Sequence, residues 1–195
     1  MATSEKLPIT VLLITLNEGH YLENLLPELK QLFNQIIILD SYSKDKTVDI
    51  ALKNKVEIYQ RKFESFGDQW NFALENLDIQ NDWTLKLDPD EKLSKELIEN
   101  FKNEIKKDDF QGFYFDRRLW FIGSPLPIKQ EVLRLWKTKY CHFINLSVNE
   151  QPIVNGKIKK ISGLMDHFDS PNLEHWIEKQ NRYTTLEAIN FLNLE

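Results

Sequence analysis

Cysteine is nearly absent from this sequence of 195 residues, which has Cys141 alone, and long apolar runs are absent too. A single thiol excludes an intrachain disulfide framework and a thiolate metal cluster, and it fits a reducing compartment. The longest apolar stretches, VLLITL and IIIL, are far shorter than the roughly 20 residues that span a bilayer, and the N-terminus lacks the pattern of a signal peptide. We therefore expect a cytoplasmic protein and leave open a peripheral contact with the inner face of a membrane.

Positive charge is also scarce, because 25 Lys and Arg stand against 30 Asp and Glu and give a formal net charge of −5. Without a basic excess or a dense basic cluster, no general attraction for nucleic acid is expected. The glycine-rich phosphate loops G-x-x-x-x-G-K-[ST] and G-x-G-x-x-G are missing as well. The sequence therefore argues against nucleic acid as a partner and against the nucleotide-binding folds that those two loops mark.

What the sequence does contain is an alternation of strand and helix patterns. Its 42% hydrophobic and 28% charged residues suit a soluble globular chain, and its length suits one domain. Buried strands are predicted at 9–16, 35–40, 56–59 and 83–88, with helices at 17–32, 48–53 and 66–77 between them and a further helix that Ser94 caps. This order indicates right-handed crossovers and a mostly parallel sheet in the first half of the chain.

The pattern changes after residue 109. Residues 110–123 and 131–138 have the two-residue period of strands, 157–168 is predicted to form shorter strands, and 172–194 is predicted to form a C-terminal helix. We therefore predict a single α/β domain with a Rossmann-like open mixed sheet flanked by helices. Its first half is residues 1–108, and its second half, residues 109–195, adds strands and the C-terminal helix.

Polar residues follow every predicted strand of the first half. They are Thr15, Asn17 and Glu18 after the first strand, Asp40 after the second, Arg61 and Lys62 beyond the third, and Asp88, Asp90 and Glu91 after the fourth. Ligands of open α/β sheets bind beyond the carboxyl ends of the strands, so these residues are expected to converge on one crevice. Each has a local alternative: Thr15 and Asn17 could cap the first helix, Asp40 could begin a turn, and the later acids could form a surface turn.

The segment LDPDE indicates a metal site. Asp88 ends a strand predicted to be buried, so its carboxylate needs a partner. Carboxylates in D-x-D spacing can face one ligand, and oxygen ligands suit Mg²⁺ or Mn²⁺. Because Mg²⁺ completes its shell with water and phosphate oxygens, a phosphorylated substrate is predicted. A D-x-D phosphatase is an alternative, although its aspartates are expected on the first strand. Glu91 either supports the site from behind or only adds charge before the helix.

Several segments in their order and spacing resemble glycosyltransferase family 2, which has the GT-A fold: ITLNEGHYLENLL, ILDSYSKDKTVDIA, FGDQWNFALEN and WTLKLDPDEKLS. Residues 148–188 narrow the resemblance to the lipopolysaccharide-core β-1,4-glucosyltransferases. The resemblance implies an inverting, metal-dependent enzyme that moves a hexose, with glucose the first choice, from a uridine diphosphate (UDP) sugar to a glycan or lipopolysaccharide core. Residues 1–108 would bind the nucleotide sugar and residues 109–195 would face the acceptor. A nucleotide-sugar-binding module without transfer activity is the alternative.

The resemblance also implies roles for individual residues. The nucleotide pocket would be lined by Thr15, Asn17, Glu18, Asp40, Arg61 and Asp88. Asp90 and His167 would bind Mg²⁺ or Mn²⁺, although an ordinary packed side chain is the alternative for His167. Lys62, Lys179 and Arg182 are candidates for contact with the diphosphate or the acceptor, with a solvated face as the alternative.

Glu150 is the expected catalytic base, because an inverting transfer needs a group that takes the proton of the acceptor hydroxyl. The family pattern has His-Glu where this chain has Asn149-Glu150, so the carboxylate is kept and any role of the neighbouring imidazole is put in doubt. Asp116 is a weaker rival. Trp83 and Trp176 are predicted core residues, whereas Trp120 and Trp136 are left between core packing and stacking on a sugar. Arg118 and Arg134 could meet an anionic acceptor.

Overall fold

The computed structural model describes residues 5–144, 150–170 and 172–192. Its elements up to residue 105 are β1 (Leu7–Thr15), α1 (Gly19–Leu32), β2 (Phe33–Asp40), α2 (Thr47–Lys53), β3 (Glu57–Gln60), α3 (Phe66–Asn76), β4 (Trp83–Lys86), β5 (Glu91–Leu93) and α4 (Lys95–Ile105). The remaining elements are β6 (Gly112–Phe121), β7 (Ser124–Lys137), the 3-10 helix η1 (Thr138–Tyr140), β8 (Cys141–Phe143), β9 (Pro152–Val154), β10 (Ile158–Phe168) and α5 (Leu173–Leu192).

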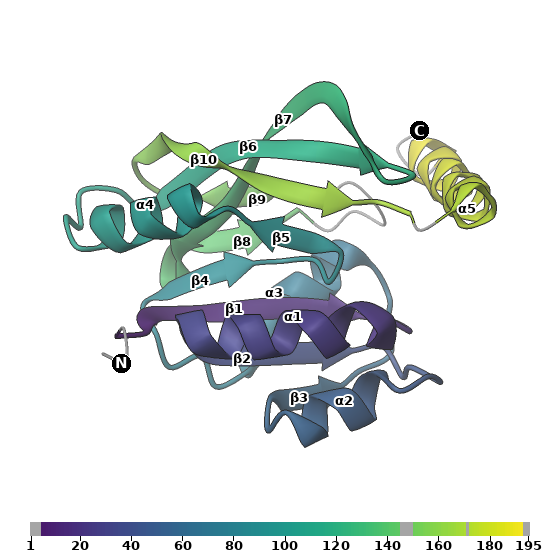
Figure 1. The fold of residues 1–195 in the computed structure, drawn as a ribbon, viewed down its shortest axis with the longest axis horizontal. Helices are drawn as coiled ribbons and strands as arrows, with labels where there is room; N and C mark the ends of the chain where they lie inside the picture. Colours follow the sequence, from purple (N-terminus) through teal and green to yellow (C-terminus); the bar gives the residue numbers. More distant parts are fainter. Residues whose placement is uncertain (1–4, 145–149, 171, 193–195) are drawn as a thin grey trace.

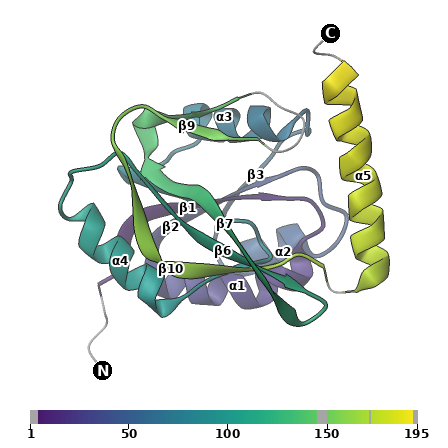
Figure 2. The ribbon, with the colours of Figure 1, turned by 90° about the horizontal axis from the view of Figure 1, so that it is seen from above.

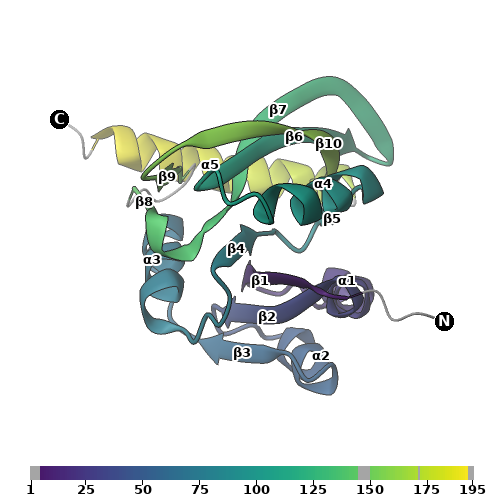
Figure 3. The same ribbon diagram turned by 90° about the vertical axis from the view of Figure 1, so that its left-hand side faces the viewer.

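The described strands form one large mixed sheet, in the order β3-β2-β1-β4-β7-β6-β10-β5, and a small β8-β9 pair (Figure 1). The strands β1, β2, β3 and β4 are parallel, as predicted. The strand β7 runs antiparallel to both β4 and β6, while β6 and β10 are parallel. Figure 3 shows β4, β1, β2 and β3 one above another, with the later strands above them. The predicted open mixed sheet is confirmed.

Helices cover both faces of the first half, which explains its continuous apolar strands. Figure 2 shows α1 and α2 on one face of the sheet and α3 with β9 on the other. Along β1, Val11 and Leu13 pack in the cluster that includes the apolar residues of α1, whereas Leu12 packs with Trp70 of α3 on the opposite face. Strands buried on both faces need apolar side chains in both directions, and β1 and β2 have them.

The tryptophans divide between core and surface. Trp83 is buried and stacks on Phe113 with ring centroids 5.4 Å apart, as predicted. Trp136 is fully buried, which leaves core packing as its place. The prediction that Trp176 is a core residue is wrong, because this side chain is half-buried and packs edge-on against Phe121.

The C-terminal strand differs from its prediction. Residues 158–168 form one strand, β10, instead of shorter ones. Its register with β6 shifts between Lys160 and Leu164, and Gly163 lies within this irregularity at φ +111°. The irregularity allows the strand to continue where α4 packs closely against it. Ser94 caps α4 as predicted, and its Oγ accepts hydrogen bonds from the backbone N–H of Leu97 at 3.2 Å and of Leu164 at 3.1 Å. Within the described ranges, no helix is long and apolar enough to cross a membrane.

We expect Gly163→Ala to destabilise the fold strongly. A Cβ at this position would lie 2.7 Å from the Cα of Leu97, and the residue would keep an unfavourable positive φ. The expected loss is about 2 to 4 kcal/mol in the free energy of unfolding, measured by urea denaturation. Gly123→Ala is the matched control, because Gly123 also has a positive φ but has no atom within 4 Å of the added carbon. An equal loss in both variants would show that the contact with α4 is unimportant.

Candidate active site

The carboxyl ends of β1 and β2 meet at Thr15 and Asp40, which are register partners. Thr15 Oγ1 donates a hydrogen bond of 2.9 Å to Oδ1 of Asp40, whose side chain is fully buried. The other carboxylate oxygen accepts from the backbone N–H of Ser43 at 2.9 Å and from Nε2 of Gln60 at 3.0 Å. Asp40 therefore begins a turn and ties the ends of β1, β2 and β3 together. Its contact with a nucleotide stays a prediction.

The loops after β1 and β2 are joined by hydrogen bonds. The backbone N–H of Asn17 donates to Ser43 Oγ at 2.8 Å, and Asn17 Oδ1 accepts from the backbone N–H of Lys44 at 2.8 Å. The backbone N–H of Gly19, the first residue of α1, donates to Asp45 Oδ2 at 3.0 Å. Helix capping by Thr15 and Asn17 is therefore wrong, because the side chain of Asp45, which belongs to the other loop, caps α1 instead.

The basic residues after β3 have separate positions. The guanidinium of Arg61 forms an ion pair with Asp68 and donates to Oε1 of Gln69 at 2.7 Å, and it lies 4.6 Å from the ring centroid of Phe72. Lys62 is exposed. The side chain of Arg61 is thus held against α3, and a solvated face fits Lys62 best.

A cluster of metal-ligand type lies where the turn after β4 meets the end of β10. Asp90, His167 and Asp169 offer ligand atoms that all lie within 4.8 Å of one another. The backbone N–H of Phe168 donates to the carbonyl of Asp90 at 2.9 Å and holds the two segments together. His167 Nε2 lies 3.1 Å from Asp90 Oδ2. Two carboxylates and an imidazole are a donor set that fits Mn²⁺ and tolerates Mg²⁺.

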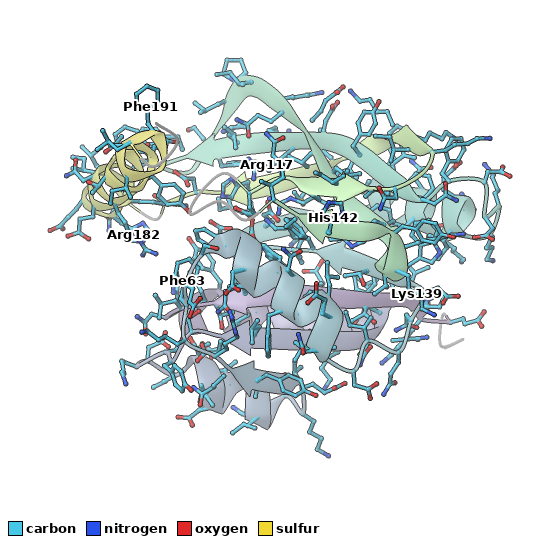
Figure 4. The ribbon with its side chains drawn as sticks, turned by 180° about the vertical axis from the view of Figure 1, so that it is seen from behind. Phe63, Arg117, Lys139, His142, Arg182 and Phe191 are labelled. Atoms are coloured by element: carbon cyan, nitrogen blue, oxygen red, sulfur yellow. The ribbon has the colours of Figure 1, made fainter. Side chains whose placement is uncertain are left out.

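The helix α5 supplies a cation to this cluster. Lys179 Nζ lies 2.6 Å from Asp169 Oδ1 and 3.9 Å from Asp90 Oδ2. Arg182 lies further along the same helix and is exposed; Arg182 and Phe191 leave α5 on opposite sides, and Arg182 lies on the side nearer to β1–β3 (Figure 4). Lys179 is therefore brought to the predicted metal residues, whereas Arg182 is not among their described partners.

Asp88 and Glu91 lie against two arginines. Arg134 Nη2 is 3.0 Å from Asp88 Oδ2 and 3.1 Å from Glu91 Oε1, and Arg117 Nη1 is 3.4 Å from Glu91 Oε1. The backbone N–H of Asp88 donates to Glu91 Oε2 at 2.9 Å. Burial raises the pKa of Glu91. Burial also opposes the ionisation of Asp88, but Lys86 and Arg134 outweigh it and hold the pKa of Asp88 well below its usual range. Glu91 thus contacts Asp88 from the protein interior and is not itself open to solvent.

Glu150 lies close to the end of β4. Its Oε1 accepts a hydrogen bond from Lys86 Nζ at 2.7 Å and another from Trp70 Nε1 at 3.1 Å. Asn149, its neighbour in sequence, lies outside the described residues. The rival base Asp116 forms an ion pair with Lys160 at 2.8 Å, in the pairing of β6 with β10. Of the two candidate bases, Glu150 is therefore the one that the fold brings near Asp88, through the shared neighbour Lys86.

The remaining basic and aromatic candidates have partners of their own. Arg118 pairs with Asp166 at 2.6 Å, and Trp120 Nε1 donates to the same carboxylate at 2.7 Å. Trp120 also lines a hollow of about 300 Å³, together with Tyr21 and Phe168. Trp120 thus stays open to a ligand.

Sequence reasoning missed three members of the site: Lys86, Trp70 and Asp169. The signal for Lys86 was a lone lysine within a strand of buried residues, because such a charge must find a partner. The signal for Asp169 was an acid two positions after His167 in the segment MDHFDS. Trp70 carried no signal beyond its place among the apolar residues of a helix.

The pKa of the Glu18 carboxyl reflects the burial and the charges around the site. Burial first and the negative charge of Asp90 second raise the pKa of Glu18 to about 7, against the opposing charge of Lys179. Besides burial, the charges of Asp90, Asp88 and Asp45 raise this pKa and that of Lys179 lowers it, so negative charge is in surplus among the charges that act on Glu18. A divalent cation would relieve this surplus.

Solved structures with a similar fold include those of TarS. The crystal structure of residues 1–349 of TarS from S. aureus matches with a TM-score of 0.59 and 17% identity, over 84% of this chain and 60% of that one. The complete TarS structure matches with a TM-score of 0.61 and 18% identity, over 86% of this chain and 37% of that one. The fold is of the GT-A class, a large mixed sheet flanked by helices.

Sequence comparison gives the family. The profile of glycosyl transferase family 2 matches residues 10–156, so the chain belongs to this family. An uncharacterized glycosyltransferase of Rickettsia prowazekii (strain Madrid E) is 26% identical over 196 residues, which cover 92% of this chain and 66% of the relative. The lipopolysaccharide core biosynthesis glycosyltransferase LpsC of Rhizobium meliloti (strain 1021) is 27% identical, over 94% of this chain and 71% of the relative. The chain thus spans 66% of the length of its Rickettsia relative.

We predict that Glu18 makes stability depend on pH in metal-free buffer. The folded chain holds this proton to a higher pH than the unfolded chain, so the stabilisation is complete below 4.5 and is lost as pH rises through about 7. Glu18→Gln mimics the protonated group and should avoid this loss, which amounts to about 1.4 kcal/mol per pKa unit. Urea denaturation of both proteins from pH 4.5 to 8 in chelator measures it. Glu23→Gln, at an exposed position of α1, is the control. A pH-independent difference would contradict the prediction.

Proposed function

We propose that the chain is the catalytic domain of an inverting, metal-dependent glycosyltransferase that moves a hexose from a UDP-sugar to a glycan or lipopolysaccharide core acceptor. One observation carries the proposal. The acids and imidazole of Asp90, His167 and Asp169 lie together beside Asp88, at the edge of the sheet where β1 and β2 end. That edge is where nucleotide ligands of open α/β sheets bind.

Similar proteins support the choice of donor, ion and acceptor. A structure of TarS 1–349 from S. aureus contains UDP-GlcNAc and matches with a TM-score of 0.58 at 17% identity. Glucosyl-3-phosphoglycerate synthase from Mycobacterium tuberculosis, in a structure with Mn²⁺, UDP and its glucosylated product, matches with a TM-score of 0.54 at 14% identity. The relative LpsC is named for lipopolysaccharide core biosynthesis. Those ligands and that acceptor belong to the similar proteins, and we transfer them to this chain as a proposal.

The residues on the donor side would have distinct tasks. Thr15, Asn17, Glu18, Asp40 and Arg61 would form the wall against the nucleoside, and Asp88 would reach the ribose. Asp90 and His167 would hold Mn²⁺ or Mg²⁺, with Asp169 as a further ligand. When bound, the ion supplies positive charge that stabilises the leaving diphosphate. Lys179 would add a second positive charge there. Lys62 and Arg182 stay candidates for contact with the diphosphate or the acceptor.

On the acceptor side, Glu150 would take the proton of the attacking hydroxyl. A single displacement at the anomeric carbon requires the nucleophile to approach opposite the leaving diphosphate. The base must therefore lie away from the metal ligands yet within the same crevice. Glu150 suits this role, because it is not among the clustered ligands Asp90, His167 and Asp169 and yet shares the neighbour Lys86 with Asp88.

Donor binding should require the ion. In a thermal-shift assay, UDP or UDP-glucose with Mn²⁺ is expected to raise the melting temperature, because ligand at 100 times its Kd stabilises the native state by about 2.7 kcal/mol. For a chain of this length that is a shift of roughly 5 to 10 °C. Asp90→Ala should lose the metal-dependent shift, and Asp109→Ala, at an exposed position, should retain it. If no uridine nucleotide shifts the melting temperature in Mn²⁺, the proposal is wrong.

Turnover should require Glu150. Release of UDP from UDP-glucose in Mn²⁺, with water or a panel of glycans as acceptor, is expected to slow by about 10² to 10⁴ in Glu150→Gln, since that is the usual contribution of a general base. The Kd for UDP should not change, because the carboxylate lies on the acceptor side. Asp116→Asn tests the rival acid and should keep the rate. If the unaltered chain binds UDP yet turns over no donor with any acceptor, it is a nucleotide-sugar-binding module.

A further inference from the structure

Glu150 is held by two donors that meet at one of its oxygens. Trp70 Nε1 and Lys86 Nζ both donate to Oε1, at 3.1 and 2.7 Å. In the described part of the chain, these are the hydrogen bonds that this carboxylate accepts. Its side chain is 11% exposed, so a small part of it is open to solvent. One oxygen is thus fixed, and Oε2 is left to meet a ligand.

Lys86 is an unusual residue for its position. It lies on β4, where every residue is buried, and its own side chain is 7% exposed. A buried ammonium is tolerated only with compensating partners. The partners are Glu150, Asp88 at 3.8 Å and the ring of Trp70, whose centroid lies 4.7 Å from Nζ. One cation therefore links the carboxylate on the acceptor side with the carboxylate on the nucleotide side.

Trp70 of α3 is the second hydrogen-bond donor to Glu150. It is 1% exposed on α3, stacks on Phe143 of β8 with centroids 5.8 Å apart, and offers its ring face to Lys86 and its N–H to Glu150. A side chain locked by packing in this way places its hydrogen-bond donor accurately. Lys86 and Trp70 thus fix the position of Glu150 from β4 and from α3.

We propose that Lys86 and Trp70 are positioning residues that aim Oε2 of Glu150 at the acceptor, an inference that rests on the proposed function. In the reaction, the acceptor oxygen forms a bond to the anomeric carbon and its proton passes to Oε2. The bond from that carbon to the diphosphate oxygen breaks, and its electron pair leaves with UDP. The two donors hold Oε1 throughout, and the contact of Lys86 with Asp88 keeps the base at a fixed separation from the donor site.

The test is a double-mutant cycle on turnover. Lys86→Met keeps an unbranched side chain of similar length and removes the charge, and Trp70→Phe keeps a ring and removes the N–H. We expect kcat for UDP release from UDP-glucose to fall about 10- to 100-fold in Lys86→Met and about 3- to 10-fold in Trp70→Phe, since misplacement of a catalytic group is costly. The Kd for UDP in Mn²⁺ should stay within about twofold in Trp70→Phe, because the described contacts of this side chain with charged residues are to Glu150 and Lys86 and not to the donor-side acids.

The Glu150→Gln background separates positioning from a structural role. A residue that acts only through Glu150 has little further effect once this carboxylate is gone, so Lys86→Met should change kcat by less than about twofold there. Lys137→Met is the matched control. Lys137 lies at the other end of the β4–β7 pairing, forms an ion pair with Asp108 at 2.6 Å, and lies 5.9 Å from the ring centroid of Trp83. The kcat of Lys137→Met should match that of the unaltered chain.

The outcomes distinguish the inference from the function on which it rests. Equal kcat in Lys86→Met and the unaltered chain, or an equal loss in both backgrounds, would contradict the positioning role and leave the glycosyltransferase proposal intact. No metal-dependent binding of UDP by the unaltered chain would contradict the proposed function itself. Should Lys86→Met melt too early to assay, Trp70→Phe carries the same cycle, because it preserves the ring between Lys86 and Phe143.

Discussion

The carboxylate of Glu91, which has no access to solvent, is the constraint on which the rest of the site depends. Its side chain is 0% exposed, and such a charge is stable in the interior only when paired and hydrogen-bonded. The strands β4 and β5 are separated in the sheet by β7, β6 and β10, so the turn that joins them must pass these strands. Glu91 lies at the end of this turn, where β5 begins, and forms ion pairs there with Arg134 of β7 and Arg117 of β6. Asp88 and Asp90 lie within that turn, so the buried pairing also places them.

The first half of the fold could be predicted because its information is local. Unbroken apolar runs identify β1 and β2, and Ser94 marks the start of α4 through its cap. The second half depends on pairings between distant segments. Nothing in the period-2 pattern of residues 131–138 indicates that β7 separates β4 from β6. Likewise, shorter strands were expected where the structure has the single strand β10, in which the positive φ of Gly163 lets the strand pass α4 closely.

The acidic residues of the site could be predicted more readily than the cations that control them. Asp40, Asp88 and Asp90 stand at strand ends, where the topology rule directs attention. A lone lysine within a strand of buried residues signals that a partner is needed, but the sequence does not say which residues supply it, so the partners of Lys86 emerge only from the fold. The sequence separation between Asp90 and Lys179 is large, and only the end of β10 brings α5 to the turn after β4. The D-x-D spacing pointed to a metal site, the resemblance assigned Asp90 and His167 to it, and the geometry added Asp169, whose signal was its place two positions after His167.

The balance of charge at this edge links metal binding to donor binding under the proposed function. Burial is the largest cause of the raised pKa of Glu18, and among the charges that act on this carboxyl Asp90, Asp88 and Asp45 stand against Lys179, which leaves a surplus of negative charge beside it. Lys179 offsets part of this surplus, but Asp169 already engages its ammonium. Without a metal ion, a diphosphate at this edge would be repelled by the negative charge of the acids. The chain as a whole adds to this repulsion, because its formal net charge is −5. A divalent ion on Asp90 and His167 reverses the local sign, so the ion and the nucleotide sugar are expected to bind as a pair.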